Sequence, residues 1–243
     1  MNPFVVHPVT SNVEVRITRE MPSLPAALEA RIDSIWARAV ARIESADGGQ
    51  LFNGLIFSID TIAPDRITGH LTEYRRLVAQ CEDTSLFPDL GIRSLAACGV
   101  LSCADGIVIG RRPAGAIYQP GMWQLCPAGS VDEGARRADG TMDHRAQLLT
   151  EIREELGLDA EALGEIIPLC VVEHPGSHVS DLGMAVSTEL DASAVLEAHR
   201  TRGNREYDPL RIIPIPELPI FLNWAGASLV PPAPLFLRRA GLL

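Results

Sequence analysis

Three glutamates, Glu151, Glu154 and Glu155, recur at spacings of three and four residues in a segment, 144–156, whose apolar residues have helical periodicity. On a helix these spacings place all three carboxylates on one face. Crowded carboxylates repel one another, and a divalent cation removes the repulsion. Mg²⁺ prefers such oxygen ligands together with water and substrate phosphate. The segment predicts a metal site, although a solvated acidic helix has the same pattern.

A second glycine-bearing segment precedes this helix. Residues 121–129 (GMWQLCPAG) have the pattern of a strand that enters a tight glycine turn. Together with the acidic helix, the segment resembles the signature of the Nudix hydrolases, G-x5-E-x7-R-E-U-x-E-E-x-G-U, in which U is an aliphatic residue. Gly129 corresponds to the opening glycine of that signature. The second half is matched at the correct spacing by Glu151, Ile152, Glu154, Glu155, Gly157 and Leu158.

The chain departs from this signature at three points. The stretch from Gly129 to Leu158 is seven residues longer than the family's. Thr150 stands where the family has an arginine, which normally orients a carboxylate of the helix. The loop glutamate is also absent, because its position is Ala135 counted from the front of the signature or Met142 counted from the back. The glutamate trio is retained, so we expect the site to bind metal.

A finer resemblance lies in the N-terminal half of the chain. The segments 51–54 (LFNG) and 68–75 (TGHLTEYR), with a strand pair at 101–112, resemble the N-terminal region of the Nudix branch that hydrolyses UDP-glucose and UDP-galactose. That branch also has an expanded signature. The resemblance covers about residues 50–220. Taken alone, Phe52 and Tyr74 are equally compatible with core aromatics, and Asn53-Gly54 with a simple turn.

The resemblance implies an enzyme that hydrolyses a nucleoside diphosphate linked to a second group, here a UDP-sugar, to UMP and a sugar 1-phosphate. It implies Mg²⁺, with Mn²⁺ as an alternative, bound by Glu151, Glu154 and Glu155 and by the Gly129 carbonyl. The general base is either one of the helix glutamates or Glu206, which lies in the polar loop before the last strand. A solvated loop charge is the alternative for Glu206.

Substrate phosphates must be held by arginine, because all 21 basic residues of the chain are arginines. Arg111 and Arg112 end a predicted strand, and alternation along that strand should turn only one of them into the site. Arg75 is a further candidate, and Tyr74 or Phe52 could stack on the nucleobase. Each of these arginines is also compatible with an ordinary surface charge.

Composition restricts the remaining classes of function. The absence of lysine excludes Schiff-base chemistry and a P-loop lysine. A net charge of −10 argues against a nucleic-acid partner, because binding to a duplex requires neutralisation of its phosphates. The five cysteines form no CxxC pair and are typical of reduced thiols in the cytoplasm. No signal peptide and no membrane span are expected. A homodimer is left open.

The fold expected is of the α/β class: a Nudix-type α/β/α sandwich around a mixed sheet, with an N-terminal α+β extension. The expected division is 1–92 for the extension or small lobe, 93–225 for the hydrolase domain and 226–243 for a tail that acts as a wrap or linker. Helices are predicted at 25–46, 144–156 (ended by Gly157) and 191–200, and a short helix capped by Thr72 follows a strand at 66–71. Further strands are predicted at 12–17, 51–62, 94–110 as a hairpin, 123–131, 166–173, 182–189 and 210–215.

Two other functions remain open at this stage. The first is a Nudix hydrolase of another nucleotide, of the ADP-ribose or coenzyme A type. The second is a nucleotide-binding module without catalysis, in which the absent arginine and loop glutamate mark a decayed site. The insertion around Arg136 and Arg137 is compatible with a flexible loop or with a substrate contact.

Overall fold

The computed structural model describes residues 4–45, 51–204 and 206–243. Its larger sheet is mixed, because β11 and β5 run parallel and the other neighbouring strands are antiparallel. The short strands β7 and β8 attach to β6 and β5. In spatial order the sheet consists of β1 (Val5–Pro8), β10 (Ile167–Glu173), β11 (Ser180–Ser187), β5 (Leu95–Cys103), β6 (Gly106–Arg111) and β12 (Leu210–Ile213), with β7 (Trp123–Leu125) and β8 (Ala128–Ser130) at its side.

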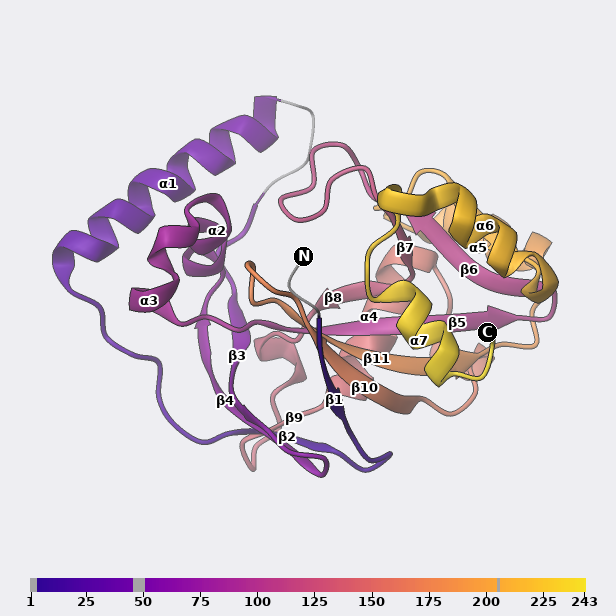
Figure 1. Cartoon of the computed structure of the whole chain (residues 1–243), viewed down its shortest axis with the longest axis horizontal. Coiled ribbons are helices and arrows are strands. Elements are labelled where there is room, and N and C mark those ends of the chain that lie inside the picture. Colours follow the sequence, from indigo (N-terminus) through magenta and orange to yellow (C-terminus); the bar gives the residue numbers. More distant parts are fainter. Residues whose placement is uncertain (1–3, 46–50, 205) are drawn as a thin grey trace.

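Helices cover both faces of this sheet (Figure 1). One face packs against α4 (His144–Leu156) and α5 (Ala192–Arg202) through the buried residues Leu148, Ile152 and Val195. The opposite face packs against α6 (Leu218–Ala225) and α7 (Ala233–Arg239). The expected α/β class, with helices on both sides of a mixed sheet, is therefore confirmed.

A smaller sheet and three helices form a second unit, here called the N-terminal lobe. The sheet has the order β3 (Leu55–Ile62), β4 (Arg66–Glu73), β2 (Glu14–Ile17) and β9 (Thr141–Met142). The helices are α1 (Ala26–Ser45), α2 (Tyr74–Glu82) and α3 (Phe87–Leu90). In Figure 1 this lobe lies on the opposite side of the molecule from α6 and α7.

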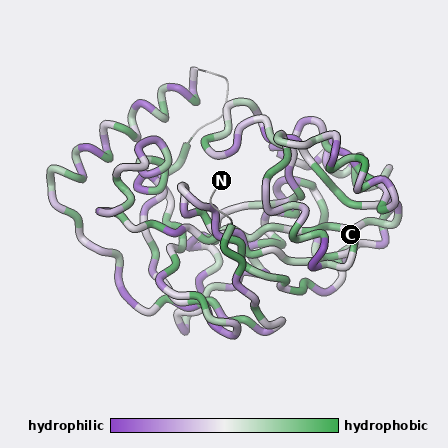
Figure 2. The backbone as a smooth tube through the Cα atoms, viewed as in Figure 1, coloured by the Kyte–Doolittle hydropathy of each residue, from purple (hydrophilic) through white to green (hydrophobic). Residues whose placement is uncertain are grey.

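The two units share one hydrophobic core. Val15, Phe57 and Ile67 from the N-terminal lobe belong to the same buried cluster as Leu148 and Leu182 of the larger unit. Hydropathy alternates along α1 in Figure 2, because Ile32, Ile35, Ala39 and Ile43 face inward and charged residues face water. Short 3₁₀ helices complete the described structure, at Thr84–Leu86, Glu133–Ala135, Ala160–Ala162, Ile215–Glu217 and Gly226–Ser228.

Several elements predicted from the sequence are found at their expected places. The helix at 144–156 ends at Gly157, which has a left-handed backbone (φ 69°) and donates hydrogen bonds back to Arg153 and Ile152. The hairpin at 94–110 turns at residues 104 and 105. Two expectations were wrong. Thr72 lies inside β4 and caps nothing, and the strand predicted at 123–131 is two strands interrupted at Pro127.

The insertion in the glutamate-bearing segment has a defined structure. Residues 141–142 form β9, which pairs with β2 of the N-terminal lobe at Val15↔Met142 and Arg16↔Thr141. The backbone N–H of Ile17 donates to the Gly140 carbonyl at 3.0 Å, and the Arg16 guanidinium donates to the Asp139 carbonyl at 3.1 Å. The insertion thus fastens the loop before α4 to the N-terminal lobe. Among the described residues, none of the helices is both long and apolar enough for a membrane crossing.

Candidate functional site

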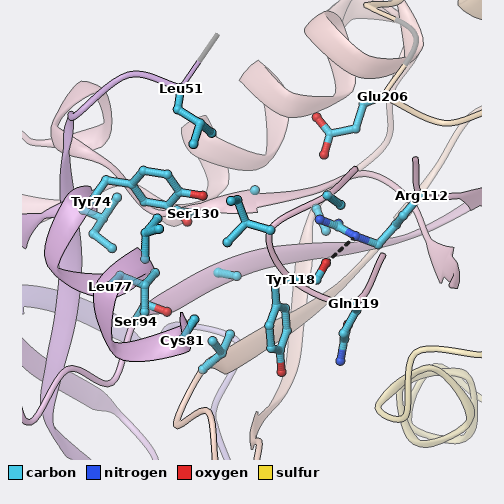
Figure 3. A pocket seen from close by; sticks show the side chains of 18 of the residues that line it. Leu51, Tyr74, Leu77, Cys81, Ser94, Arg112, Tyr118, Gln119, Ser130 and Glu206 are labelled. Atoms are coloured by element: carbon cyan, nitrogen blue, oxygen red, sulfur yellow. Dashed lines mark hydrogen bonds between the residues drawn. The ribbon is translucent and has the colours of Figure 1, made fainter. Parts of the chain in front are cut away.

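A cavity of about 1080 Å³ lies between the N-terminal lobe and the larger sheet. Its walls come from distant parts of the chain, which include the segment 51–56, α2, β5, the β6–β7 loop (residues 112–122), the β8–α4 region, β11 and the loop before β12. Figure 3 shows that Glu206 and Arg112 lie at one side, whereas Leu51, Tyr74 and Leu77 lie at the other. The cavity therefore has a charged end and a mainly apolar end.

The helix α4 and the strand β8 build the charged end together. Glu151 and Glu155, one turn apart on α4, both line the cavity, and so does Gly129 of β8. A side chain at position 129 would collide with Glu151, because an added Cβ would lie 2.0 Å from its Oε1 atom. Glycine is thus required for the Glu151 carboxylate to lie against the backbone of β8.

The carboxyl group of Glu155 is almost completely removed from water, with 1% of the residue exposed. The backbone N–H of Ala128 donates to its Oε2 atom at 3.2 Å. Burial, followed by the charges of Glu206 and Glu151, raises the pKa of Glu155 well above its usual range. The group is therefore held where its ionised form is costly unless a cation comes close.

Glu151 is half-buried and accepts a hydrogen bond from the Gln147 side chain at 2.7 Å. Burial raises its pKa from 4.5 to about 7, and that hydrogen bond offsets part of the effect. Burial also raises the pKa of Glu206, while the Arg112 charge and a hydrogen bond with Glu155 act in the opposite direction. Three carboxyl groups with raised pKa values thus converge at one end of the cavity.

Arg112 lies on the same side of the cavity as Glu206 (Figure 3). Its Nε–H donates to the Tyr118 carbonyl at 3.1 Å, and an outer nitrogen donates to the Gln124 side chain at 2.6 Å. Both acceptors are neutral, and within the described part of the chain Arg112 forms no ion pair with a carboxylate at 4.0 Å or less. Its charge is therefore available to an anion in the cavity.

The apolar end belongs to the N-terminal lobe. Tyr74, at the start of α2, packs edge-on against Trp36 of α1 with ring centroids 6.2 Å apart. Leu51 and Leu77 line the same end, and Phe52, which is 75% exposed, lies at its rim. The neighbouring Asn53 is fixed on both sides, because its amide donates to Glu73 at 3.0 Å and its oxygen accepts from the Arg75 backbone at 2.9 Å.

Three residues expected at the site do not line the cavity. Glu154 is exposed on α4, although it lies between residues that face the cavity. Arg111 is exposed and donates to the Gly121 carbonyl, so of the arginine pair at the end of β6 only Arg112 reaches the cavity. The Arg75 guanidinium is occupied by Glu29, Asp33 and Glu73, each at 2.7 Å.

Other cavity residues were missed by sequence reasoning. Asp181 of β11, Gln124 of β7 and Tyr118 of the β6–β7 loop all line the cavity. The signal for Asp181 was present, since a carboxylate inside the apolar run 179–186 needs a partner when the strand is buried. That partner is His174, whose Nε2 atom lies 2.6 Å from the carboxylate. Tyr118 and Gln124 carried no such signal, because only the folded loop brings them to the cavity.

Within the described ranges, no group of three His, Cys, Asp or Glu side chains is arranged so that it could hold a metal ion as it stands. The three converging carboxyl groups and the Gly129 backbone nonetheless offer oxygen donors.

Comparison with known proteins gave structural similarities only. No protein-family model matches the chain, and no curated protein matches it. RenU, a Nudix hydrolase from M. smegmatis, is 21% identical with a TM-score of 0.42, over 62% of this chain and 85% of RenU. DR0079 from Deinococcus radiodurans is 18% identical with a TM-score of 0.41, over 60% of this chain and 82% of DR0079. The Ap4A hydrolase of C. elegans is 17% identical with a TM-score of 0.38, over 60% of this chain and 95% of that protein.

Proposed function

We propose that this chain is a Nudix-type hydrolase that cleaves a nucleoside diphosphate-linked substrate in a metal-dependent reaction, and that the substrate is a UDP-sugar. UDP-glucose or UDP-galactose would give UMP and a sugar 1-phosphate. One observation carries the proposal. The glutamate-bearing helix and the LFNG and Tyr74 segments, which resemble this branch at distant places in the sequence, line one and the same cavity.

The carboxyl groups fit a hard divalent cation. Glu151, Glu155 and Glu206 are brought together in a partly water-excluded cavity, where burial raises the pKa of all three and repulsion by neighbouring carboxylates raises it further for Glu151 and Glu155. A cation would favour their ionised forms and offset the repulsion. We propose that Glu151 and Glu155 hold Mg²⁺ or Mn²⁺ with the Gly129 carbonyl, and that the exposed Glu154 contributes from the rim. A bound divalent cation supplies charge neutralisation of the diphosphate and acidifies a water molecule.

The protein's own groups supply orientation and proton transfer in this proposal. Arg112 binds the diphosphate, because its guanidinium is held only by neutral acceptors. Glu206 acts as the general base. Burial raises its pKa, and a carboxylate of increased basicity next to Glu155 in the cavity suits a group that takes a proton from water. Gln147 keeps the Glu151 carboxylate against β8.

The apolar end would bind the nucleoside. Tyr74 presents its ring toward a region lined by Leu51 and Leu77, and an aromatic ring of this kind can stack on a planar base. Phe52 at the rim can cover it. The five cysteine thiols are all free, in line with the reducing cytoplasm expected for such an enzyme.

The direct test is product analysis after incubation of the pure protein with UDP-glucose, ADP-ribose and a coenzyme A thioester, each with Mg²⁺ and with EDTA. We expect UMP and glucose 1-phosphate to appear only with the metal. Turnover of ADP-ribose or the thioester instead would reject the UDP-sugar assignment and keep the reaction class. Binding of nucleotide by calorimetry without turnover of any substrate would reject catalysis.

A further inference from the structure

The β6–β7 loop forms one wall of the cavity, and little packing holds it there. Residues 112–119 all line the cavity, and the sequence between Arg112 and Tyr118 (PAGAI) offers few bulky side chains. Backbone hydrogen bonds close the base of the loop, from Arg112 to the Met122 carbonyl at 2.9 Å and from Gly121 to the Pro113 carbonyl at 3.1 Å. Within the described structure, no backbone hydrogen bond joins residues 114–120 to another element. The position of the loop over the cavity therefore depends on contacts made by its side chains.

Tyr118 makes those contacts. Its hydroxyl lies 2.8 Å from Nδ1 of His174 and 3.0 Å from the Ser177 hydroxyl, and its ring packs edge-on against the His174 ring with centroids 5.7 Å apart. His174 is in turn fixed, because its Nε2 atom lies 2.6 Å from the Asp181 carboxylate. His174 and Asp181 are 3% and 6% exposed. The loop is thus anchored to a buried pair that belongs to the larger sheet.

The hydrogen-bond roles in this chain of contacts follow from the donors available. An ionised carboxylate only accepts, so Nε2–H of His174 donates to Asp181. In the tautomer with the proton on Nε2, Nδ1 is an acceptor and receives the Tyr118 O–H. The Ser177 hydroxyl can donate to the remaining lone pair of the Tyr118 oxygen. Each polar group has a partner of the correct type, so Tyr118 has one favoured position.

The same residue fixes Arg112 through its backbone. The Tyr118 carbonyl accepts the Nε–H of Arg112 at 3.1 Å, a contact drawn in Figure 3. Gln124 of β7 holds an outer nitrogen of the guanidinium at 2.6 Å. These two contacts use two of the five N–H groups of the guanidinium and leave the others for a ligand. A displacement of Tyr118 would remove one of the two contacts that orient Arg112.

We propose that Tyr118 is a positioning residue for the anion subsite: its side chain anchors the β6–β7 loop to His174 and Asp181, and its carbonyl aims Arg112 at a diphosphate in the cavity. The inference rests on the proposed function in one respect, namely that Arg112 binds the phosphates. It adds that the strength of this binding is set by a hydroxyl that does not touch the substrate.

A double-mutant cycle tests whether Tyr118 acts through Arg112. Tyr118→Phe, Arg112→Gln and the double variant are compared with wild type by steady-state kinetics and by calorimetry with inorganic pyrophosphate in Mg²⁺. We expect Arg112→Gln to weaken binding by about 10- to 100-fold, as for loss of a charged hydrogen bond. Tyr118→Phe should raise KM several-fold with a smaller change in kcat. When Arg112→Gln is already present, the addition of Tyr118→Phe should change KM and pyrophosphate affinity very little.

The outcomes separate this inference from the proposed function. Additive effects of the two substitutions, or a Tyr118→Phe variant identical to wild type, would overturn the positioning role even if UDP-glucose is hydrolysed. Pyrophosphate binding with the expected cycle but no hydrolysis of any substrate would keep the positioning role and reject the proposed reaction. Wild-type protein that neither hydrolyses substrate nor binds pyrophosphate would overturn both. Unchanged thermal unfolding of Tyr118→Phe would confirm that the effect is local.

Discussion

Glu155 shows how much a single carboxyl group can be constrained by its surroundings. Its carboxyl accepts a hydrogen bond from the Ala128 backbone and lies next to Glu206, yet it is almost fully buried. Such a group contributes little to folding, because removal of its charge from water is costly. Its position is better explained by a role in binding or catalysis at the charged end of the cavity, because functional groups are often retained at a cost in folding stability.

The first prediction follows from this trade-off. Glu155→Gln should lower kcat/KM for the substrate in Mg²⁺ by about 10²- to 10⁴-fold, the range typical of a lost acid–base or charge-stabilising group. Thermal unfolding should be unchanged or occur at a higher temperature, because glutamine fills the same volume without a buried charge. Glu165→Gln, at an exposed position outside the cavity, is the matched control and should retain full activity. Full activity of Glu155→Gln would reject the role assigned to it.

The second prediction concerns pH and metal. The pKa of Glu151 is raised from 4.5 in the unfolded chain to about 7 in the fold, so the folded state binds its proton more tightly. The corresponding stabilisation is complete below pH 4.5 and is lost as pH rises through about 7, and it amounts to roughly 3 kcal/mol. Metal-free protein should therefore unfold at a lower temperature at pH 8 than at pH 5.5.

Added Mg²⁺ should reverse that loss at pH 8, because it binds the ionised carboxylates of the folded state. Unfolding curves at the two pH values, with Mg²⁺ and with EDTA, measure both effects. Glu151→Gln should flatten the pH dependence and weaken the response to Mg²⁺. A metal-free protein equally stable at both pH values would contradict the burial of these carboxyl groups.

At the level of elements, the approach of β8 to α4 determines the geometry of the charged end. The third prediction is that Gly129→Ala displaces the Glu151 carboxylate, because the new Cβ would lie within 2.0 Å of it. Activity should be largely lost, and stability should fall by about 1–3 kcal/mol, as for other overpacked sites. Gly115→Ala, with no atom within 4 Å of the added Cβ, should leave the unfolding temperature unchanged.

Arg75 connects three elements of the N-terminal lobe. It pairs with Glu29 and Asp33 of α1 and with Glu73 at the end of β4. The fourth prediction is that Arg75→Gln lowers the free energy of unfolding by about 1–3 kcal/mol, because these carboxylates lose their partner. KM should change only modestly, because Arg75 reaches the cavity only indirectly, through the hydrogen bond between its backbone N–H and Asn53. A large rise in KM with unchanged stability in denaturant unfolding would restore Arg75 as a substrate contact.

The elements also show what the sequence could and could not predict. The helix α4 was predictable to its last residue, because local periodicity and Gly157 determine both its face and its end. The interruption at Pro127 was not, since the pairing of β7 with β6 and of β8 with β5 depends on distant strands. The pairing of Arg75 with α1 and the anchor of Tyr118 could not be predicted either, because their partners lie 42–59 residues away along the chain.

At the scale of the whole molecule, the shared core joins the two units. Val15, Phe57 and Ile67 pack in the same cluster as Leu148 and Leu182, and β9, which directly precedes α4 in the sequence, completes the sheet of the lobe. Separation of the two units would expose this core and remove pairing partners from both sheets.

The fifth prediction is therefore that the chain unfolds as one cooperative unit. Near-UV and far-UV circular dichroism should give coincident unfolding transitions in denaturant. A fragment of residues 1–92 expressed alone should lack a fixed tertiary structure, because its apolar face has lost the packing of α4 and β11. Two separated transitions, or a fragment with the dispersed amide NMR spectrum of a folded protein, would show independent domains.

The pairing of β1 with β10 and of β2 with β9 has a consequence for the order in which the protein forms during synthesis. Among the described strands β1 is synthesised before the others, yet Val5 pairs with Glu173 and lies at the edge of the larger sheet. β2 can pair with β4 soon after both are synthesised, but its other edge stays unpaired until Met142 of β9 has been made. Contacts between such distant segments form slowly, and unpaired strand edges are prone to aggregation. β1 and β2 therefore lack a pairing partner until β10 and β9 have been synthesised, and a chaperone would matter most during that interval.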